Sequence, residues 1–413
     1  MKHIYTSIDI GSDTIKLVVC ELYKNKLNLL AASSVKSKGI KKGLITDVEE
    51  ASISIRQAFN EIEDMLGIHI KQVIASIPSY FAEFTMVKGE TRLLGETVVG
   101  EDVINVLENA IQSKLNPNKE MVTILPIDFS IDNQGGIKEP KGLNGTLLGA
   151  RAIMVTTPKK NVYSVISLLE EIGVEVVDIS LNSIGDAYAF KNKENSDLVG
   201  AIVNIGAETT SVSLYNKGII VKNSVIGLGG KSIDNDLAYM YKIDMKDAVR
   251  MKEKFALAYK KYASPNEGYE VLNTSGEKVV IKQLEASEIV MSRIEEILTL
   301  ARKEISILAE KPIEYIIVTG GVSSSSSFDY IVSEILGKNA IVGNVKVVGI
   351  RNNKYSSVVG NIVYFIHKQK LKGQDFTMIS NNDMEALSSS KRNVINISND
   401  TMLGKVFGYF FGE

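Results

Sequence analysis

The sequence predicts an α/β protein that is built from two similar lobes. Two hairpins with an Ile-Gly step and a hydroxyl-rich turn lie about 195 residues apart, and apolar strands flank both turns. Between and after them, amphipathic helical stretches alternate with short apolar runs, which is typical of α/β folds. The length of 413 residues leaves room for several domains, each with its own core.

The first hairpin lies near the N-terminus and has the composition of a phosphate loop. Gly11 lets the backbone approach a ligand closely, Ser12 and Thr14 add hydroxyl groups, and successive turn amides can point at one anion. Asp9 cannot contact a phosphate without repulsion, so we expect it to act through water on a bound Mg²⁺. Lys16 supplies positive charge. An ordinary edge hairpin is the alternative for this stretch alone.

The chain up to residue 83 predicts the rest of a small α/β unit. We expect a strand at 27–35, an amphipathic helix at 48–66 that ends at Gly67, and a buried strand at 73–77. Four lysines lie between the strand at 27–35 and the helix, and we interpret them as a solvated face rather than a binding patch: Lys36, Lys38, Lys41 and Lys42.

A change in composition after residue 83 predicts an inserted unit at 84–157. We expect strands at 84–99, 122–131 and 150–156, a helix at 100–115, and a glycine-rich loop before the last strand. The unit contains no convincing catalytic group, and its size suits a small domain. We therefore interpret it as an interaction module.

The second hairpin, at 199–215, loosely repeats the first. Helices are expected before it at 161–172 and 182–190, with a strand at 174–179. Asn204 precedes an Ile-Gly step at Gly206, and Thr209 and Thr210 follow. A matched pair of hairpins in this order predicts two lobes that grip one polyphosphate from opposite sides.

Two glycine pairs strengthen this prediction. Gly229 and Gly230 precede a helix, and a helix N-terminus with nearby glycines suits an anion. Gly320 and Gly321 end an apolar strand in a flat turn, against which an adenine ring could lie. Each pair alone is a weak signal, because Gly-Gly after a strand is usually an ordinary turn.

Composition argues against several classes of function. The net charge of −2 argues against a general nucleic-acid binder. A single cysteine excludes a disulfide framework, and the three histidines have no metal-ligand spacing. We find no signal-peptide profile and no apolar run of about 18 residues. We therefore expect a protein that is soluble, or attached to a membrane by a segment that is too short to span the bilayer.

The order of the hairpins and glycine pairs resembles that of the actin-like ATPase superfamily. Within it, the chain is most similar to the FtsA family of bacterial cell-division proteins. The loop at 38–47 resembles the loop after that family's third strand, and the insert lies where the family has its 1C subdomain. The end of the chain resembles its membrane-targeting helix. The resemblance implies a two-lobed actin-like (ribonuclease H-like) ATPase fold with an inserted 1C-type subdomain and a C-terminal amphipathic helix.

The resemblance also implies a site for ATP and Mg²⁺. Phosphate and the metal's water shell would be held by Asp9, Gly11, Ser12 and Lys16, and by the second loop at Asn204, Gly206, Thr209 and Thr210. The rest of the nucleotide would contact Gly229, Gly230, Lys252, Glu253, Gly320, Gly321 and Ser323. For Lys252 and Glu253, a solvated helix face is the alternative.

Departures from the family pattern predict slow or undetectable hydrolysis. Asn204 stands where members that hydrolyse ATP well usually have Asp, and Ala207 and Glu208 stand where they have glycines. Asn182, with Asp186 one turn along, is in the position of a water-orienting group. Losing one such group typically costs ~10²–10³ in rate. Enzyme activity therefore stays open, and we predict no catalytic residue.

Residues 234–306 predict a largely helical outer subdomain with a hairpin at 269–281 and a long helix at 286–308. The resemblance implies that this subdomain receives the C-terminal peptide of FtsZ, with Arg293 and Glu296 in the matching stretch. Pairing of these charges with neighbours on the helix is the alternative.

The C-terminal segment predicts a membrane anchor. After a helix at 356–369, the polar residues 371–398 predict a flexible tether. Residues 399–413 predict an amphipathic helix in the membrane interface, and docking onto the protein's own core is the alternative. Its apolar face would contain Met402, Leu403, Val406, Phe407, Tyr409, Phe410 and Phe411.

These elements predict a first lobe at 1–83 and 158–199 and a second lobe at 200–370. The resemblance implies an ATP-binding, filament-forming protein that anchors FtsZ to the cytoplasmic face of the cell membrane at the division site. Late division proteins would bind through the insert, and no nucleic acid is expected. Two alternatives stay open: an active ATPase, kinase or chaperone of the superfamily, or a pilus-assembly adaptor similar to PilM.

Overall fold

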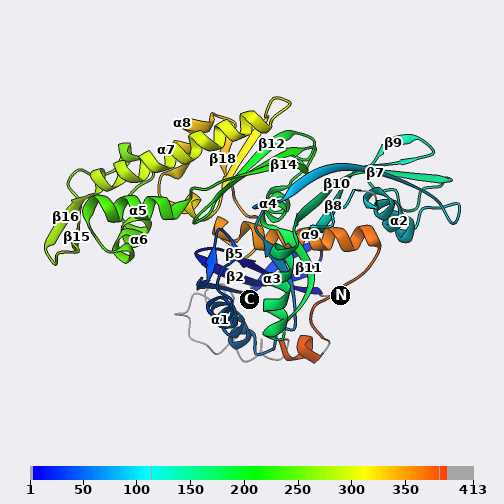
Figure 1. Cartoon of the computed structure of the whole chain (residues 1–413), viewed down its shortest axis with the longest axis horizontal. Helices are drawn as coiled ribbons and strands as arrows, with labels where there is room; N and C mark the ends of the chain where they lie inside the picture. Colours follow the sequence, from blue (N-terminus) through cyan, green and yellow to red (C-terminus); the bar gives the residue numbers. More distant parts are fainter. Residues whose placement is uncertain (1–2, 113, 381, 388–413) are drawn as a thin grey trace, which may run out of the picture.

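Two lobes with sheets of the same topology form the body of the molecule (Figure 1). The computed structural model describes residues 3–112, 114–380 and 382–387. In each lobe two parallel strands extend an antiparallel three-stranded meander, in the orders β3-β2-β1-β6-β11 and β14-β13-β12-β17-β18. The second sheet therefore repeats the first, strand for strand.

The first lobe contains the first of the two predicted hairpins. Its sheet consists of β1 (His3–Ile10), β2 (Thr14–Tyr23), β3 (Lys26–Lys36), β6 (Gln72–Ile77) and β11 (Glu175–Leu181). The short strands β4 (Ile40–Lys41) and β5 (Leu44–Ile45) and the helices α1 (Val48–Leu66) and α3 (Lys159–Glu171) complete it. Helix α1 has the predicted bounds, because Asp47 caps its N-terminus and Gly67 ends it at a φ of 68°.

The insert is a four-stranded antiparallel sheet with one helix. It contains β7 (Glu83–Arg92), α2 (Gly100–Ile111), β8 (Lys119–Ile131), β9 (Gln134–Ile137) and β10 (Leu147–Pro158). The predicted strand to residue 99 is wrong beyond Arg92, where the chain makes irregular hydrogen bonds to 142–146. Strand β9 was missed because Asp132 and Asn133, both at positive φ, form a tight turn inside the expected loop.

The second lobe contains the second hairpin and an outer helical part. Its sheet consists of β12 (Val199–Ile205), β13 (Thr210–Asn216), β14 (Ile219–Ile226), β17 (Tyr315–Thr319) and β18 (Ala340–Val342). The other elements are α5 (Gly230–Tyr241), α6 (Met245–Lys254), η1 (Lys260–Tyr262), β15 (Gly268–Leu272), β16 (Lys278–Lys282), α7 (Gln283–Leu308), η2 (Gly321–Ser324), α8 (Phe328–Leu336) and η3 (Asn353–Tyr355). In Figure 1, α5, α6, β15 and β16 extend from the second lobe on the side opposite the insert.

Two helices cross between the lobes: α4 (Asn182–Phe190) and α9 (Ser356–Lys372). They approach so closely that a Cβ added at Gly360 would lie 1.7 Å from the Gly185 carbonyl oxygen. Only glycine fits at such a crossing. The crossing places Asp186 of α4 within hydrogen-bond distance of the first turn of α9, at the base of the space between the lobes.

The predicted tether at 371–398 is wrong for its first half. Helix α9 continues to Lys372, and the described residues between 374 and 387, here called the docked tail, pack on the first lobe. Three apolar side chains of the docked tail are buried in the first-lobe core: Met378, Ile379 and Leu387. This packing could not be predicted from the polar composition of the segment, because only a few apolar side chains make the contacts.

The docked tail covers a part of β1 that β6 leaves unpaired. Strand β6 pairs with β1 only at Ser7–Asp9. Nearer the N-terminus, Met378 N–H donates to the Ile4 carbonyl oxygen at 3.0 Å, and Ile4 N–H donates to Thr377 Oγ1 at 3.1 Å. The terminal helix predicted at 399–413 lies outside the described residues. Within the part that the structure describes, no helix is long and apolar enough to cross a bilayer.

Candidate functional site

A cleft of about 470 Å³ lies between the two lobes. The β1–β2 turn of the first lobe and the β12–β13 turn of the second both contribute to its wall, together with α5, α6 and the turn after β17. Most of the predicted nucleotide-binding residues line it: Asp9, Gly11, Ser12, Lys16, Asn204, Gly206, Thr209, Gly230, Lys252, Glu253, Gly320 and Gly321. The two hairpins that organise the sequence therefore meet at one cleft.

Three of the predicted residues lie behind the cleft wall rather than on it. Thr210 is buried, and its Oγ1 donates to a backbone carbonyl before α5 at 2.9 Å. A Cβ on Gly229 would lie 2.6 Å from the Gly206 carbonyl oxygen, and Ser323 Oγ donates to the Gly320 carbonyl oxygen at 2.7 Å. These residues shape the turns that a ligand in the cleft would meet.

The two cleft turns have the same length and register. Ile10 pairs with Ile15 across the first turn, and the second turn repeats this register, so each contains four residues. A Cβ on the leading glycine would lie 2.8 Å from a carbonyl oxygen of the same turn at Gly11, and 3.0 Å at Gly206. The matching positions are Asp9 with Asn204, Ser12 with Ala207, Asp13 with Glu208, and Lys16 with Ser211.

Asp9 and Lys16 form an ion pair beside the first turn. The two residues face each other in the β1–β2 register, and Lys16 Nζ lies 3.0 Å from Asp9 Oδ2. The side chain of Lys16 is only 12% exposed, and that of Asp9 is 16% exposed. Because both also line the cleft, the ammonium group is placed where an anionic ligand can share it.

The second hairpin has a neutral amide at the position of that acid, with a buried acid behind it. Asn204 Nδ2 donates to Asp186 Oδ2 at 2.6 Å, while the Ser356 and Ser357 hydroxyls donate to Asp186 Oδ1 at 2.6 and 2.8 Å. Burial raises the pKa of Asp186 to about 6, although these three hydrogen bonds act in the opposite direction. Asp186 therefore orients the Asn204 amide and is itself enclosed.

Asn182 lies on the cleft wall, and its amide oxygen is already engaged. Ser79 donates to Asn182 Oδ1 through its N–H at 3.1 Å and through its hydroxyl at 2.6 Å. Neither this amide nor the enclosed carboxyl of Asp186 places a free carboxylate beside a water molecule in the cleft.

Lys252 of α6 lines the cleft and forms an ion pair with a carboxylate on α5. Its Nζ lies 2.8 Å from Asp234 Oδ1. Burial raises the pKa of Asp234 above its ordinary value, although the Lys252 ammonium opposes this. Glu253 lines the same side of the cleft. Lys252 is thus a paired cation whose side chain is only 14% exposed, rather than part of a fully solvated helix face.

The turn after β17 presents an open surface at its second glycine. Gly320 has a φ of 95°, and a Cβ there would lie 2.4 Å from the Ile205 carbonyl oxygen. A Cβ on Gly321 would meet no heavy atom of the described chain within 4 Å. The first glycine therefore holds the turn against the second hairpin, and the second leaves open space beside the turn.

The four lysines at 36–42 are exposed, as expected for a solvated face, but the backbone at Lys42 also takes part in the cleft. Lys42 and Gly43 line the cleft from the first lobe. Lys42 N–H donates to Glu208 Oε2 across the cleft at 2.6 Å, and Gly43 N–H donates to Ser12 Oγ at 2.7 Å. The local sequence gives no sign of these contacts, because they arise only where separate loops and lobes meet.

Several residues outside the glycine turns also line the cleft and were not predicted from the sequence: Pro78, Lys231, Asp234, Asn352 and Lys354. Among them, Lys354 shows the electrostatic character of the cleft. Burial, followed by the nearby Lys16 ammonium, lowers the pKa of Lys354. Two cations that crowd each other in a cleft favour an anionic ligand.

The predicted partner-binding residues Arg293 and Glu296 lie on α7. Arg293 Nε donates to Asp236 Oδ2 at 2.6 Å and its Nη2 donates to Asp236 Oδ1 at 2.9 Å. Arg293 also forms an ion pair with Glu296. These charges therefore join α5 to α7, and the side-chain pairing that is the alternative to partner binding is present.

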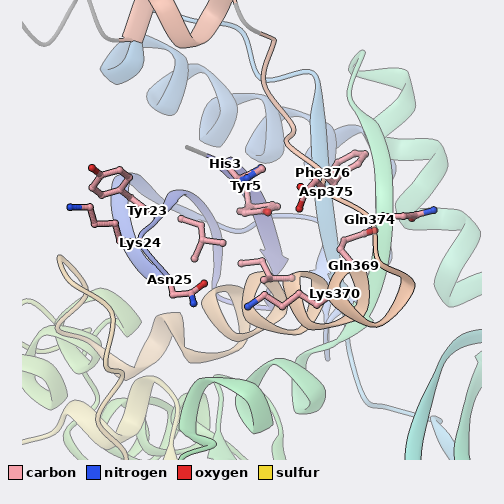
Figure 2. Close-up of a pocket in the computed structure, with 12 residues that line it drawn as sticks. His3, Tyr5, Tyr23, Lys24, Asn25, Gln369, Lys370, Gln374, Asp375 and Phe376 are labelled. Atoms are coloured by element: carbon pink, nitrogen blue, oxygen red, sulfur yellow. The ribbon is translucent and has the colours of Figure 1, made fainter. Parts of the chain in front are cut away.

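A second cavity of about 470 Å³ lies away from this cleft (Figure 2). The start of β1, the β2–β3 turn, the end of α9 and the docked tail form its wall, with Tyr5, Lys24, Lys370 and Phe376 among the lining residues. Because it draws on only one of the two repeated sheets, it does not join the two hairpins. The interlobe cleft is therefore the candidate functional site.

Comparisons with known proteins give one consistent family. A sequence model described as "Cell division protein FtsA" matches residues 201–360, and one described as "SHS2 domain inserted in FTSA" matches residues 82–156. The cell division protein FtsA of Bacillus subtilis is 27% identical over 375 residues, which cover 90% of this chain and 85% of that protein. FtsA of Streptococcus pneumoniae is 27% identical over 361 residues, covering 86% and 78%.

Solved structures of actin-like proteins share the fold. A PilM–PilN type IV pilus biogenesis complex matches with a TM-score of 0.59 at 15% identity, covering 87% of this chain and 98% of the other. MreB5 of Spiroplasma citri bound to ADP matches with a TM-score of 0.55 at 14% identity, covering 90% and 98%. The two-lobed actin-like architecture is thereby confirmed.

Proposed function

The chain belongs to the FtsA family of cell division proteins, and from this premise we propose that it binds ATP with Mg²⁺ in the interlobe cleft. We propose further that the nucleotide-bound protein assembles into filaments. These filaments would hold FtsZ at the cytoplasmic face of the cell membrane at the division site. The observation that carries the proposal is a single cleft lined by both glycine turns of a repeated lobe.

The residues of the cleft suit a magnesium polyphosphate. Gly11 and Gly206 lead two turns of equal register, and Lys16 supplies a cation beside the first. Asp9 would act on the water shell of Mg²⁺, which would neutralise phosphate charge. The open surface at Gly321 would accept the adenine ring. MreB5 of Spiroplasma citri, which has the same fold, binds ADP in its solved structure.

Hydrolysis in this cleft would be slow or undetectable. The second hairpin offers the amide of Asn204, and the nearest acid behind it, Asp186, is enclosed by three hydrogen bonds. Because neither the Asn204 amide nor the enclosed Asp186 would orient an attacking water as a free carboxylate does, ATP would serve as a ligand for conformation and assembly more than as a fuel.

The remaining parts would provide attachment. The outer helical part, with Arg293 and Glu296 on α7, would receive the C-terminal peptide of FtsZ, and the insert would receive late division proteins. The segment at 399–413 would lie in the membrane interface. One such anchor binds weakly, whereas many anchors on one filament bind by avidity. Assembly and membrane attachment would therefore be coupled.

Liposome co-sedimentation with purified FtsZ tests this function. The intact chain with Mg·ATP should carry FtsZ into the liposome pellet, and a chain cut after Ser398 should leave both proteins in the supernatant. A sample without nucleotide should pellet less of both. Equal pelleting by the intact and cut chains, or no transfer of FtsZ, would contradict the proposal.

A further inference from the structure

Glu208, at the tip of the second cleft turn, reaches across the cleft. Its Oε2 accepts from Lys42 N–H at 2.6 Å, and Lys42 belongs to the first lobe. Its Oε1 accepts from Lys231 Nζ at 2.8 Å, and the same ammonium donates to the Ser12 backbone oxygen at 3.1 Å. One carboxylate therefore occupies donors from both lobes, between the two phosphate turns.

This arrangement is a property of the second turn alone. Asp13 is the acid at the matching position of the first turn; its side chain is 37% exposed, and it pairs with Lys36, whose side chain is 67% exposed. The Glu208 side chain is 22% exposed. Burial acts to raise the pKa of Glu208, but the hydrogen bonds from Lys231 and Lys42 outweigh it and keep that pKa below its ordinary value. The carboxylate is charged and fully engaged at neutral pH.

The groups that Glu208 engages are the kind that bind phosphate. A backbone N–H at a loop tip and a lysine ammonium are typical ligands of phosphate oxygens. An anion between the two turns would need the same donors and would be repelled by the carboxylate. Diphosphate and triphosphate ligands would differ in whether they reach this point, because only the latter carry a third phosphate.

We propose that Glu208 is an internal competitor of the terminal phosphate, and that it thereby sets the preference of the cleft between ATP and ADP. This inference rests on the proposed binding of nucleotide in the cleft. ATP binding displaces the carboxylate and releases Lys42 N–H and the Lys231 ammonium to the terminal phosphate. ADP leaves the contacts in place. The wild-type chain therefore discriminates less between ATP and ADP than the same cleft without the carboxylate.

Equilibrium titrations of the full-length chain with Mg·ATP and Mg·ADP test the proposal. In Glu208→Gln and Glu208→Ala the affinity for ATP should rise about tenfold, while the affinity for ADP should change less than twofold. The isosteric Gln variant controls for loss of packing. Asp13→Asn removes the matching acid of the other turn, and it should shift both affinities by the same factor.

The outcomes separate this inference from the proposed function. Equal changes for ATP and ADP in both Glu208 variants, or a fall in ATP affinity, would overturn the role of Glu208 while nucleotide binding itself stands. Failure of the wild-type chain and of all variants to bind either nucleotide would overturn the proposed function and this inference with it.

Discussion

The two cleft hairpins have the same backbone and different chemistry. Both have four-residue turns led by a glycine, in sheets of the same strand order. The first holds an acid–base pair, Asp9 with Lys16, whereas the second has an amide and a hydroxyl, Asn204 and Ser211, at the same positions. The first hairpin therefore provides fixed charge, and the second provides hydrogen bonds tuned by groups behind and across it.

This difference shows how a repeated fold can divide one task. The first loop contains both members of its ion pair, Asp9 and Lys16. Its chemistry can therefore be predicted from about ten consecutive residues. The second loop depends on Asp186 from α4 and on Ser356 and Ser357 from α9. Its properties therefore depend on how α4 and α9 cross behind it.

Making the second hairpin like the first should have the largest effect. Asn204→Asp would put a second carboxylate beside Asp186, where Asn204 Nδ2 now donates at 2.6 Å. Because two carboxylates in contact, one of them buried, cannot both ionise cheaply, we expect a loss of about 3–5 kcal/mol in the free energy of unfolding at pH 8. Thermal unfolding should show a smaller loss at pH 5.

The double variant N204D/D186N provides the matched control for that change. It exchanges the acid and the amide, so a hydrogen-bonded pair with one charge is restored. We expect it to recover most of the lost stability at pH 8. Equal destabilisation in the single and double variants would show that the two side chains act independently, against the coupling described here.

The enclosed acid behind the second hairpin should make the stability of the protein depend on pH. The pKa of Asp186 is raised to about 6, so the folded protein keeps its proton to higher pH than the unfolded chain. The contribution to stability is therefore present below about pH 4 and is lost as the pH rises through 6.

Asp186→Asn isolates this contribution from that of other titrating groups. Relative to wild type, the variant should gain up to about 3 kcal/mol between pH 4 and pH 7, measured by denaturant unfolding at each pH. A difference between variant and wild type that stays constant over this range would show that Asp186 does not titrate as its surroundings indicate.

The sheets also differ at their central strands, and the docked tail compensates. Strand β12 pairs with β17 from Gly200 onward, whereas β6 reaches only Ser7–Asp9 of β1. Met378→Ala should therefore cost about 2 kcal/mol, the low end for a buried methionine because the site is near the surface. Met86→Ala, at a side chain 60% exposed, should leave the thermal midpoint unchanged. Equal effects would mean that the tail contributes no packing.

Removing the fixed charge of the first hairpin should have the smallest of these effects. Lys16→Ala removes the ammonium that faces both Asp9 and the cleft, so we expect ATP affinity to fall about ten- to thirtyfold. Ser211→Ala, at the matching position, should change it less than twofold. Titrations with Mg·ATP measure both, and equal losses would contradict the division of roles between the hairpins.

Local pattern was enough to predict the lobes, the hairpins and most of the cleft, because glycine turns and apolar strands leave short-range signals. Contacts between segments that are distant in the sequence could not be predicted from local pattern. Lys42 resembles any surface lysine until the lobes face each other, and its partner Glu208 lies 166 residues away. Docking of the tail depends on a few apolar side chains such as Met378 within a polar segment, and on an unpaired part of β1 that no sequence pattern shows.

Hydrogen–deuterium exchange with and without Mg·ATP tests the central claim most directly, namely that one nucleotide is held by both hairpins. The account predicts that ATP protects the peptides containing 10–16 and 205–211 together, with the same dependence on ATP concentration. Protection of one hairpin alone, or of neither at saturating ATP, would contradict it.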